Sequence, residues 1–118
     1  MASPLDATAS AEADGARITL TGSLDRDGDE AMTAAYAVAR TTGTGPITLD
    51  FTATGYINST GIALIVRLLA EARRDRREVI AVGLSEHYRE IFRITRLSDF
   101  LTIADGSPAS SVSQEATR

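Results

Sequence analysis

The 118-residue chain contains no cysteine, no lysine and a single histidine. The absence of cysteine excludes structural disulfides, thiolate metal sites and cysteine nucleophiles. One histidine, His87, is too few for a histidine-rich metal site, and no glycine-rich phosphate loop of the GxGxxG or GxxxxGK type is present. We therefore expect neither a metal site nor another cofactor.

Long apolar runs are also missing. No segment approaches the roughly 18 consecutive apolar residues of a membrane-spanning helix, and the start of the sequence lacks a charged segment followed by an apolar one. The net charge of −4 disfavours nucleic acid as a partner. We accordingly expect a cytoplasmic protein that binds neither a membrane nor nucleic acid.

All twelve basic residues are arginine, which we attribute to codon usage before function. The densest cluster is Arg73-Arg74-Asp75-Arg76-Arg77. It falls at the predicted end of a helix, where cations complement the helix dipole and solvate the end. That structural interpretation is favoured over an anionic partner.

Polar and apolar alternation, with turn and cap residues, predicts one α/β domain with a mixed β-sheet and helices packed on it. The order is ββαβαβαβ, with residues 52–57 as a loop. Residues 1–105 should form the domain, and the polar residues 106–118 a disordered tail. The expected strands are 7–12, 17–21, 46–51, 78–82 and a short one ending at 103, and the expected helices are 31–40, 59–74 and one capped by Ser85.

The helix predicted at 59–74 is apolar on most sides, so it should be the most buried helix of the fold. Its apolar residues should share one core with those of the neighbouring strands. The expected members are Ile62, Ile65, Val66 and Leu69, with Leu49 and Val82.

Asn58-Ser59-Thr60-Gly61 stands at the junction between a buried strand and this helix. Such a junction exposes hydroxyls beside the unpaired N–H groups of the helix, which together with the helix dipole stabilise a phosphate. Ser59 is therefore a candidate phosphorylation switch. The alternative is that Asn58 or Ser59 simply caps the helix, which is worth about 1 kcal/mol.

Three segments make the chain resemble a STAS domain, the fold of bacterial anti-sigma factor antagonists, over residues 5–105. They are Gly22-Ser23-Leu24-Asp25, then Leu49-Asp50-Phe51 followed by Ile57 to Ile62, and finally Gly83-Leu84-Ser85 through to Ile103. In this resemblance Ser59 aligns with the phosphorylatable serine. The usual aspartate before that serine is replaced by Asn58, which still caps a helix but removes a negative charge and could alter kinase recognition.

The resemblance implies a regulatory binding module and not an enzyme. An unphosphorylated antagonist of this family binds an anti-sigma factor that is also a serine kinase of the GHKL type, and it is released when the kinase phosphorylates the serine; a phosphatase resets it. The implied contact residues are Asp25, Asn58, Ser59, Thr60 and Gly61. The alternative is a STAS scaffold, or a ligand- or nucleotide-sensing subunit of a signalling or transport assembly.

Two further groups of residues have open interpretations. The acidic loop of Asp25, Asp27, Asp29 and Glu30 lacks the spacing of a calcium-binding loop, so a solvated patch near the partner surface is expected. Tyr56 and Tyr88 are either interface anchors or core residues with an exposed hydroxyl.

Overall fold

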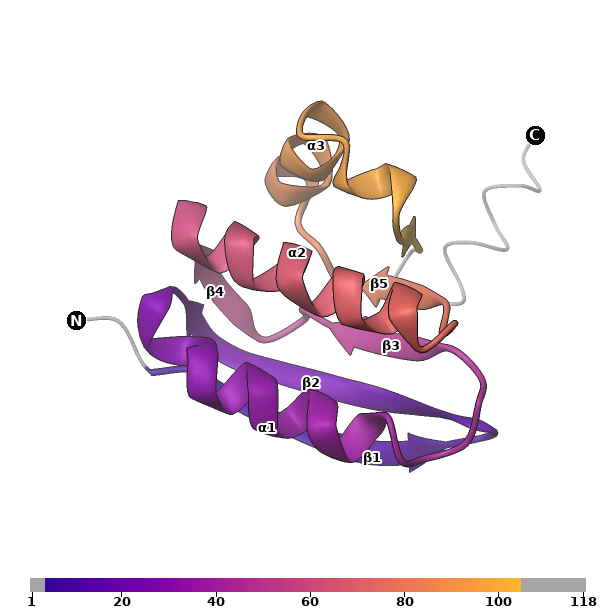
Figure 1. Cartoon of the computed structure of the whole chain (residues 1–118). Helices are drawn as coiled ribbons and strands as arrows, with labels where there is room; N and C mark the ends of the chain where they lie inside the picture. The colour runs from indigo at the N-terminus through magenta and orange to yellow at the C-terminus, as the bar shows by residue number, and fades with distance from the viewer. Residues whose placement is uncertain (1–3, 105–118) are drawn as a thin grey trace.

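The structure is a computed structural model and describes residues 4–104, so the predicted tail at 106–118 lies outside the described residues. Figure 1 shows two helices side by side across one face of a sheet, with a third helix beyond them. The elements are β1 (Asp6–Glu12), β2 (Gly15–Leu24), the 3₁₀ turn η1 (Arg26–Gly28), α1 (Asp29–Ala39), β3 (Ile47–Asp50), β4 (Thr54–Ile57), α2 (Ser59–Arg74), β5 (Val79–Val82), α3 (Glu86–Ile94), the 3₁₀ turn η2 (Leu97–Asp99) and β6 (Thr102–Ile103).

The main path of the sheet runs β1-β2-β3-β5-β6. β1 is antiparallel to β2, and the remaining pairs along the path are parallel. The α/β fold with a mixed sheet is therefore confirmed. Because the parallel strands share one direction, their carboxyl ends meet at a single edge, and the first turn of α2 lies at that edge (Figure 1).

β4 was not predicted, because residues 52–57 were expected to be a loop. β2 continues through Gly22, whose φ of 102° marks a shift in register. Before this residue β2 pairs with β3, and after it β2 pairs with β4. β4 contains only four residues, and its pairing partner is distant in the sequence, so local alternation is too short to reveal it.

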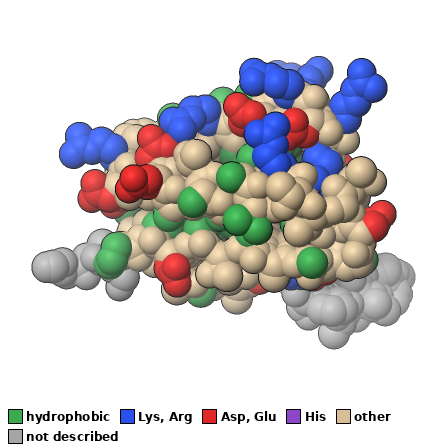
Figure 2. All heavy atoms as spheres, turned by 60° about the horizontal axis from the view of Figure 1, so that its bottom comes forward, with side chains coloured by type: hydrophobic (Ala, Val, Ile, Leu, Met, Phe, Trp, Pro, Cys, Tyr) green, Lys and Arg blue, Asp and Glu red, His purple; other side chains and the backbone are tan. Residues whose placement is uncertain are grey.

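The arginine cluster at the end of α2 is only partly solvated. Arg73 and Arg74 occupy the last turn of α2, as predicted. Arg77, however, is buried, with 8% of its surface exposed, and donates hydrogen bonds to three carbonyl oxygens. Figure 2 shows arginine side chains gathered along one side of the molecule with acidic side chains among them. Some of these side chains form ion pairs between α1 and α2, such as the 2.8 Å contact between Arg67 and Asp29.

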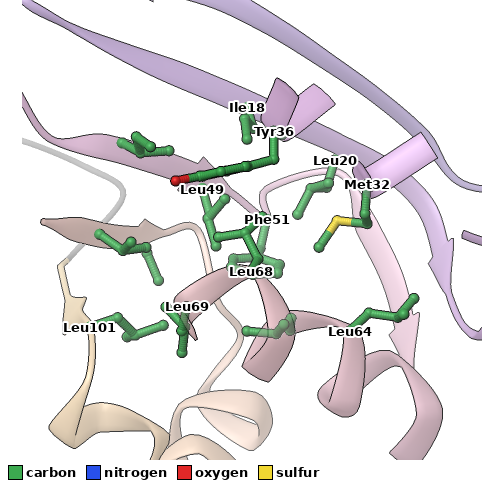
Figure 3. Close-up of a cluster of buried hydrophobic side chains, with 14 of the residues drawn as sticks. Ile18, Leu20, Met32, Tyr36, Leu49, Phe51, Leu64, Leu68, Leu69 and Leu101 are labelled. Carbon is green, nitrogen blue, oxygen red and sulfur yellow. The ribbon is translucent and has the colours of Figure 1, made fainter. Parts of the chain in front are cut away.

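The core lies between the sheet and the helices (Figure 3). α2 contributes one apolar face to it, and the side chains of Ile65 and Leu69 are buried there with Leu49. Val66 was expected in this core, but it is 47% exposed. Consecutive helical residues are rotated by about 100°, so Val66 points away from the face that carries Leu64 and Leu68. α2 is therefore amphipathic, and Ile62 and Val82 are only half-buried.

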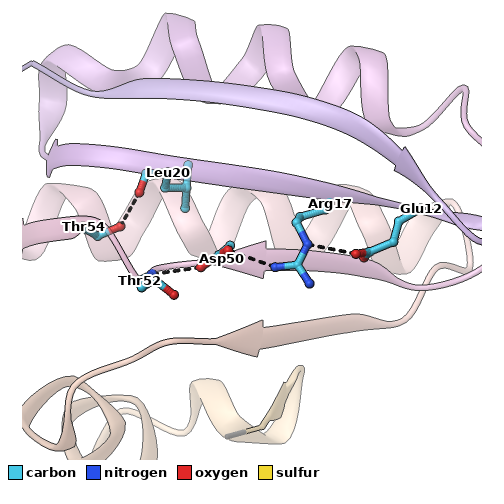
Figure 4. A network of polar contacts seen from close by, with 6 residues as sticks. All are labelled: Glu12, Arg17, Leu20, Asp50, Thr52 and Thr54. Atoms are coloured by element: carbon cyan, nitrogen blue, oxygen red, sulfur yellow. Dashed lines mark hydrogen bonds and ion pairs between the residues drawn. The ribbon is translucent and has the colours of Figure 1, made fainter. Parts of the chain in front are cut away.

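The opposite face of the sheet carries polar side chains (Figure 4). Arg17 on β2 bonds to Glu12 and to Asp50, each at 2.9 Å. Partial burial raises the pKa of Asp50, but hydrogen bonds from Thr52 and the charge of Arg17 outweigh it and lower the pKa overall. Within residues 4–104, no helix has the length and apolarity needed to cross a membrane.

Candidate functional site

The site lies where β4 passes into α2. Asn58 stands between them with extended backbone angles, φ −97° and ψ −175°, and its Oδ1 accepts a hydrogen bond from the Gly61 N–H at 2.8 Å. Its own N–H donates to the Leu24 carbonyl oxygen at 3.2 Å. Of the two candidate caps, Asn58 is therefore the N-cap, and Ser59 is the first residue of the helix.

Gly61 holds the first turn of α2 against the end of β2. A Cβ atom built on Gly61 would lie 2.1 Å from the Leu24 carbonyl oxygen. No side chain fits in that space, because real Cβ atoms do not approach a backbone oxygen so closely. The close approach fixes the start of α2 relative to Leu24 and to Asp25, the next residue.

Ser59 and Thr60 are exposed, and neither hydroxyl has a hydrogen-bond partner within residues 4–104. The first N–H groups of a helix lack intrahelical acceptors and carry the positive end of its dipole. The first turn of α2 contains no acidic residue that would occupy this positive end. The Ser59 hydroxyl is therefore accessible, and it lies where added negative charge is stabilised.

Asp25 lies at the same edge as the first turn of α2. Its Oδ1 accepts a hydrogen bond from the Asp27 N–H at 3.0 Å, so Asp25 caps the 3₁₀ turn η1. The structure thus brings Asp25 together with Asn58, Ser59, Thr60 and Gly61. Their role in binding a partner stays a prediction.

The acidic loop divides into paired and unpaired carboxylates. Asp29 forms the ion pair with Arg67, and the hydrogen bond from Arg67 lowers the pKa of Asp29. In the described part of the chain, Asp25, Asp27 and Glu30 have no ion pair, and no three potential metal ligands come together. The acidic loop is therefore a mixed surface, because Arg26 and Arg67 lie among its carboxylates.

The two tyrosines take different positions around β4. Tyr56 is 56% exposed, three residues before Ser59. Tyr88 on α3 is half-buried, and its hydroxyl bonds to the backbone of Ile57. The Tyr88 hydroxyl is engaged and not exposed, so the expected core residue with an exposed hydroxyl is wrong for Tyr88, and its role as an interface anchor stays a prediction. A bond between residues 31 apart leaves no signal in a local sequence pattern.

Comparison with known proteins places this arrangement in a family. A family model described as "Mlab, STAS domain" matches residues 7–103. The anti-sigma-B factor antagonists of Listeria monocytogenes serovar 1/2a and Listeria innocua serovar 6a are each 34% identical to the chain over 55 residues, or 47% of this chain and 48% of theirs. The match thus spans about half the length of the curated relatives.

Solved structures share the fold over nearly the whole chain. The unphosphorylated anti-sigma factor antagonist SpoIIAA superposes with a TM-score of 0.67 at 17% identity, covering 95% of this chain and 99% of that one. The phosphorylated form of Bacillus SpoIIAA gives 0.66 at 19% identity, with coverages of 92% and 98%. An anti-sigma factor antagonist from Mycobacterium paratuberculosis gives 0.70 at 12% identity, covering 97% of both chains. At these identities the likeness is one of fold.

Proposed function

The chain belongs to the STAS domain family, and we propose that it is an anti-sigma factor antagonist that acts by partner switching. In this proposal the unphosphorylated protein binds an anti-sigma factor in the cytoplasm and so releases a sigma factor. The anti-sigma factor is also a serine kinase of the GHKL type, and it transfers a phosphate to Ser59. The complex then dissociates, and a phosphatase restores the unphosphorylated form. The chain itself catalyses no step, and residues 1–105 form the functional domain.

The observation that carries this proposal is the exposed Ser59 hydroxyl at the start of α2. A phosphate there adds about −1.5 to −2 charges. The N–H groups of the first turn can stabilise this charge within the protein. A partner surface that fits the uncharged hydroxyl, however, would have to desolvate the phosphate or meet its charge.

The surface around Ser59 supports a contact made by several elements. Asp25 from the end of β2 and the first turn of α2 lie at one edge, and the exposed Tyr56 lies on β4 close to them. Tyrosine is enriched at interface hot spots because its ring offers a large, stiff contact area. A partner that covers this edge would therefore contact the phosphoacceptor directly.

The decisive experiment uses the purified chain with its candidate kinase and Mg-ATP. The enzyme to test is a small ATP-binding serine kinase encoded in the genomic neighbourhood of this protein. If no such kinase is encoded there, capture from a lysate followed by mass spectrometry identifies the candidate. The wild type and Thr60→Ala should each gain one phosphate, and Ser59→Ala should gain none. Thr60→Ala is the matched control, because it removes the neighbouring exposed hydroxyl and leaves Ser59 in place.

Binding measured on the same variants completes the test. Ser59→Ala should bind the kinase as the wild type does, since Asn58 and not Ser59 caps the helix. Ser59→Asp should bind poorly, because its carboxylate imitates the phosphorylated state. Phosphate on Thr60, or on neither residue, would refute Ser59 as the switch.

A second function is favoured by Asn58, which stands where the resembling antagonists have aspartate. If the switch has been lost, the domain would act as a scaffold or as a ligand-sensing subunit of a larger assembly. Such a protein would form stable oligomers or co-purify with a ligand, whereas a switching antagonist would be a monomer that binds its kinase only when unphosphorylated. Sedimentation and native mass spectrometry separate the two cases.

A further inference from the structure

Tyr88 connects the first turn of α3 to the strand that precedes Ser59. The Ile57 N–H donates to the Tyr88 hydroxyl oxygen at 3.0 Å, and this hydroxyl donates to the Ile57 carbonyl oxygen at 3.4 Å. The second bond is the weaker one, because O–H···O bonds are commonly about 2.7–2.8 Å long. The Tyr88 N–H in turn donates to the Ser85 hydroxyl at 3.3 Å, so the residue is fixed at the start of its own helix.

These bonds occupy the edge of β4 that β2 leaves open. In a strand, successive residues direct their N–H and C=O groups to opposite edges. Asn58 directs its N–H to Leu24 on β2, so the polar groups of Ile57 point the other way. β4 has only four residues and pairs with β2 alone. Tyr88 therefore gives this short strand a second support.

The peptide between Ile57 and Asn58 is bonded on both sides. Its carbonyl oxygen accepts from Tyr88, and its N–H donates to Leu24. Rotation of this peptide would break a bond on each side and would also move the Asn58 cap. The next residue in the chain is Ser59, so the direction of its side chain depends on how this peptide is held.

We propose that Tyr88 is a positioning residue for Ser59, which it orients through the Ile57–Asn58 peptide for transfer of a phosphate from the kinase. This inference rests on the proposed function, in which Ser59 receives the phosphate. The Tyr88 hydroxyl contacts no reacting atom, since its bonds are to the Ile57 backbone. Its removal should slow the transfer step and leave recognition by the kinase intact, because the exposed contact residues stay in place.

The test compares Tyr88→Phe with Tyr36→Phe in the full chain, using the kinase that phosphorylates the wild type. Both variants lose one hydrogen-bonded phenolic hydroxyl and keep the ring, but the Tyr36 hydroxyl bonds to Asp75 at the C-terminal end of α2, whereas Ser59 lies at its N-terminal end. Tyr88→Phe should lower kcat about two- to tenfold, the loss expected for one hydrogen bond, with KM and Kd unchanged. Amide exchange at Ile57 should accelerate by a similar factor, and Tyr36→Phe should change none of these quantities.

Each other outcome counts against a specific claim. If the wild type is phosphorylated on Ser59 but Tyr88→Phe keeps the wild-type kcat, the positioning role is wrong and the proposed function stands. The role is equally wrong if kcat falls without faster exchange at Ile57, or if Tyr36→Phe slows the reaction as much. If the wild type accepts no phosphate on Ser59, the proposed function fails and the role of Tyr88 fails with it.

Discussion

The C-terminal end of α2 is fastened by side chains, whereas its N-terminal end is fastened mainly by backbone groups. At the C-terminal end, Asp75 accepts hydrogen bonds from the Tyr36 hydroxyl at 2.6 Å and from Arg40 at 2.8 Å. Arg77 donates to the carbonyl oxygens of Gly45 and Thr42 at 2.6 and 3.1 Å.

At the N-terminal end the attachment consists of the bond from the Asn58 N–H to the Leu24 carbonyl oxygen and the close approach of Gly61 to β2, and the Asn58 side chain adds the helix cap. The hydroxyls of Ser59 and Thr60 take no part in it. A charge added to Ser59 would therefore change the surface without breaking an interaction that holds the helix. A charge change at Asp75 or Arg77 would disturb the packing of α2. The difference indicates which end of the helix can serve as a switch.

The largest expected effect concerns the backbone attachment at the N-terminal end. Gly61→Ala places a methyl group 2.1 Å from the Leu24 carbonyl oxygen, so α2 must move away from β2. We expect a loss of about 3 kcal/mol in the free energy of unfolding, measured with urea.

The matched control for this variant is Gly55→Ala, where the added Cβ meets nothing nearer than 4.0 Å. It should change stability by less than about 0.5 kcal/mol. Equal stability of the two variants would show that the start of α2 is not held by this close approach.

The next effect concerns the C-terminal end. Arg77→Ala removes the donors to the carbonyl oxygens of the loop between α1 and β3, and we expect a loss of about 2 kcal/mol in the free energy of unfolding. Arg74→Ala is the control, since its side chain is 72% exposed and its contact with Glu71 is 3.6 Å long. That variant should lose less than about 0.5 kcal/mol. A similar loss in the two variants would mean that the arginine cluster stabilises the protein only through its net charge.

A smaller effect is expected at the helix cap. Asn58→Ala removes the oxygen that accepts from Gly61 and should cost about 1 kcal/mol in the free energy of unfolding. Asn58→Asp keeps an acceptor there and should leave the stability within about 0.5 kcal/mol of wild type. It should nevertheless change the rate at which Ser59 is phosphorylated, because it puts a carboxylate beside the hydroxyl. An unchanged rate would mean that the kinase does not sense this position.

The local features of α2 could be predicted from the sequence. The helix runs over Ser59–Arg74, as expected, because a cap residue marks its start and arginines mark its end. The alternation of polar and apolar residues likewise predicted a strand at 17–21, which lies within β2. What these features share is that neighbours in the sequence determine them.

Features that depend on distant partners could not be predicted. Val66 is exposed because no described element covers that face of α2, which a pattern of apolar residues cannot reveal. Arg77 is buried because the loop between α1 and β3 passes beside it. The bond from Tyr88 to Ile57 joins two elements whose contact follows from the topology alone. At the candidate site the sequence therefore indicated Ser59 at the start of α2 but not the hydrogen bond from Tyr88 to the strand before it.

The smallest expected effect is a dependence on pH at the C-terminal end of α2. Hydrogen bonds from Tyr36 and Arg40 lower the pKa of Asp75 below its ordinary value. A carboxylate whose pKa is lower in the folded state stabilises the protein above its unfolded pKa of about 3.9, and this contribution is lost as the pH falls through the folded pKa. Asp75→Asn should therefore be less stable than the wild type at pH 7, and the difference should shrink as the pH is lowered toward about 3.

Urea denaturation of both proteins across this range checks the expectation, with Glu78→Gln as the control because Glu78 is exposed, lies outside the helices and has no ion pair within the described residues. The control should follow the wild type at every pH. A constant difference between Asp75→Asn and the wild type would mean that the charge of Asp75 is not what fastens this end. The contrast between the two ends of α2 would then rest on Arg77 alone.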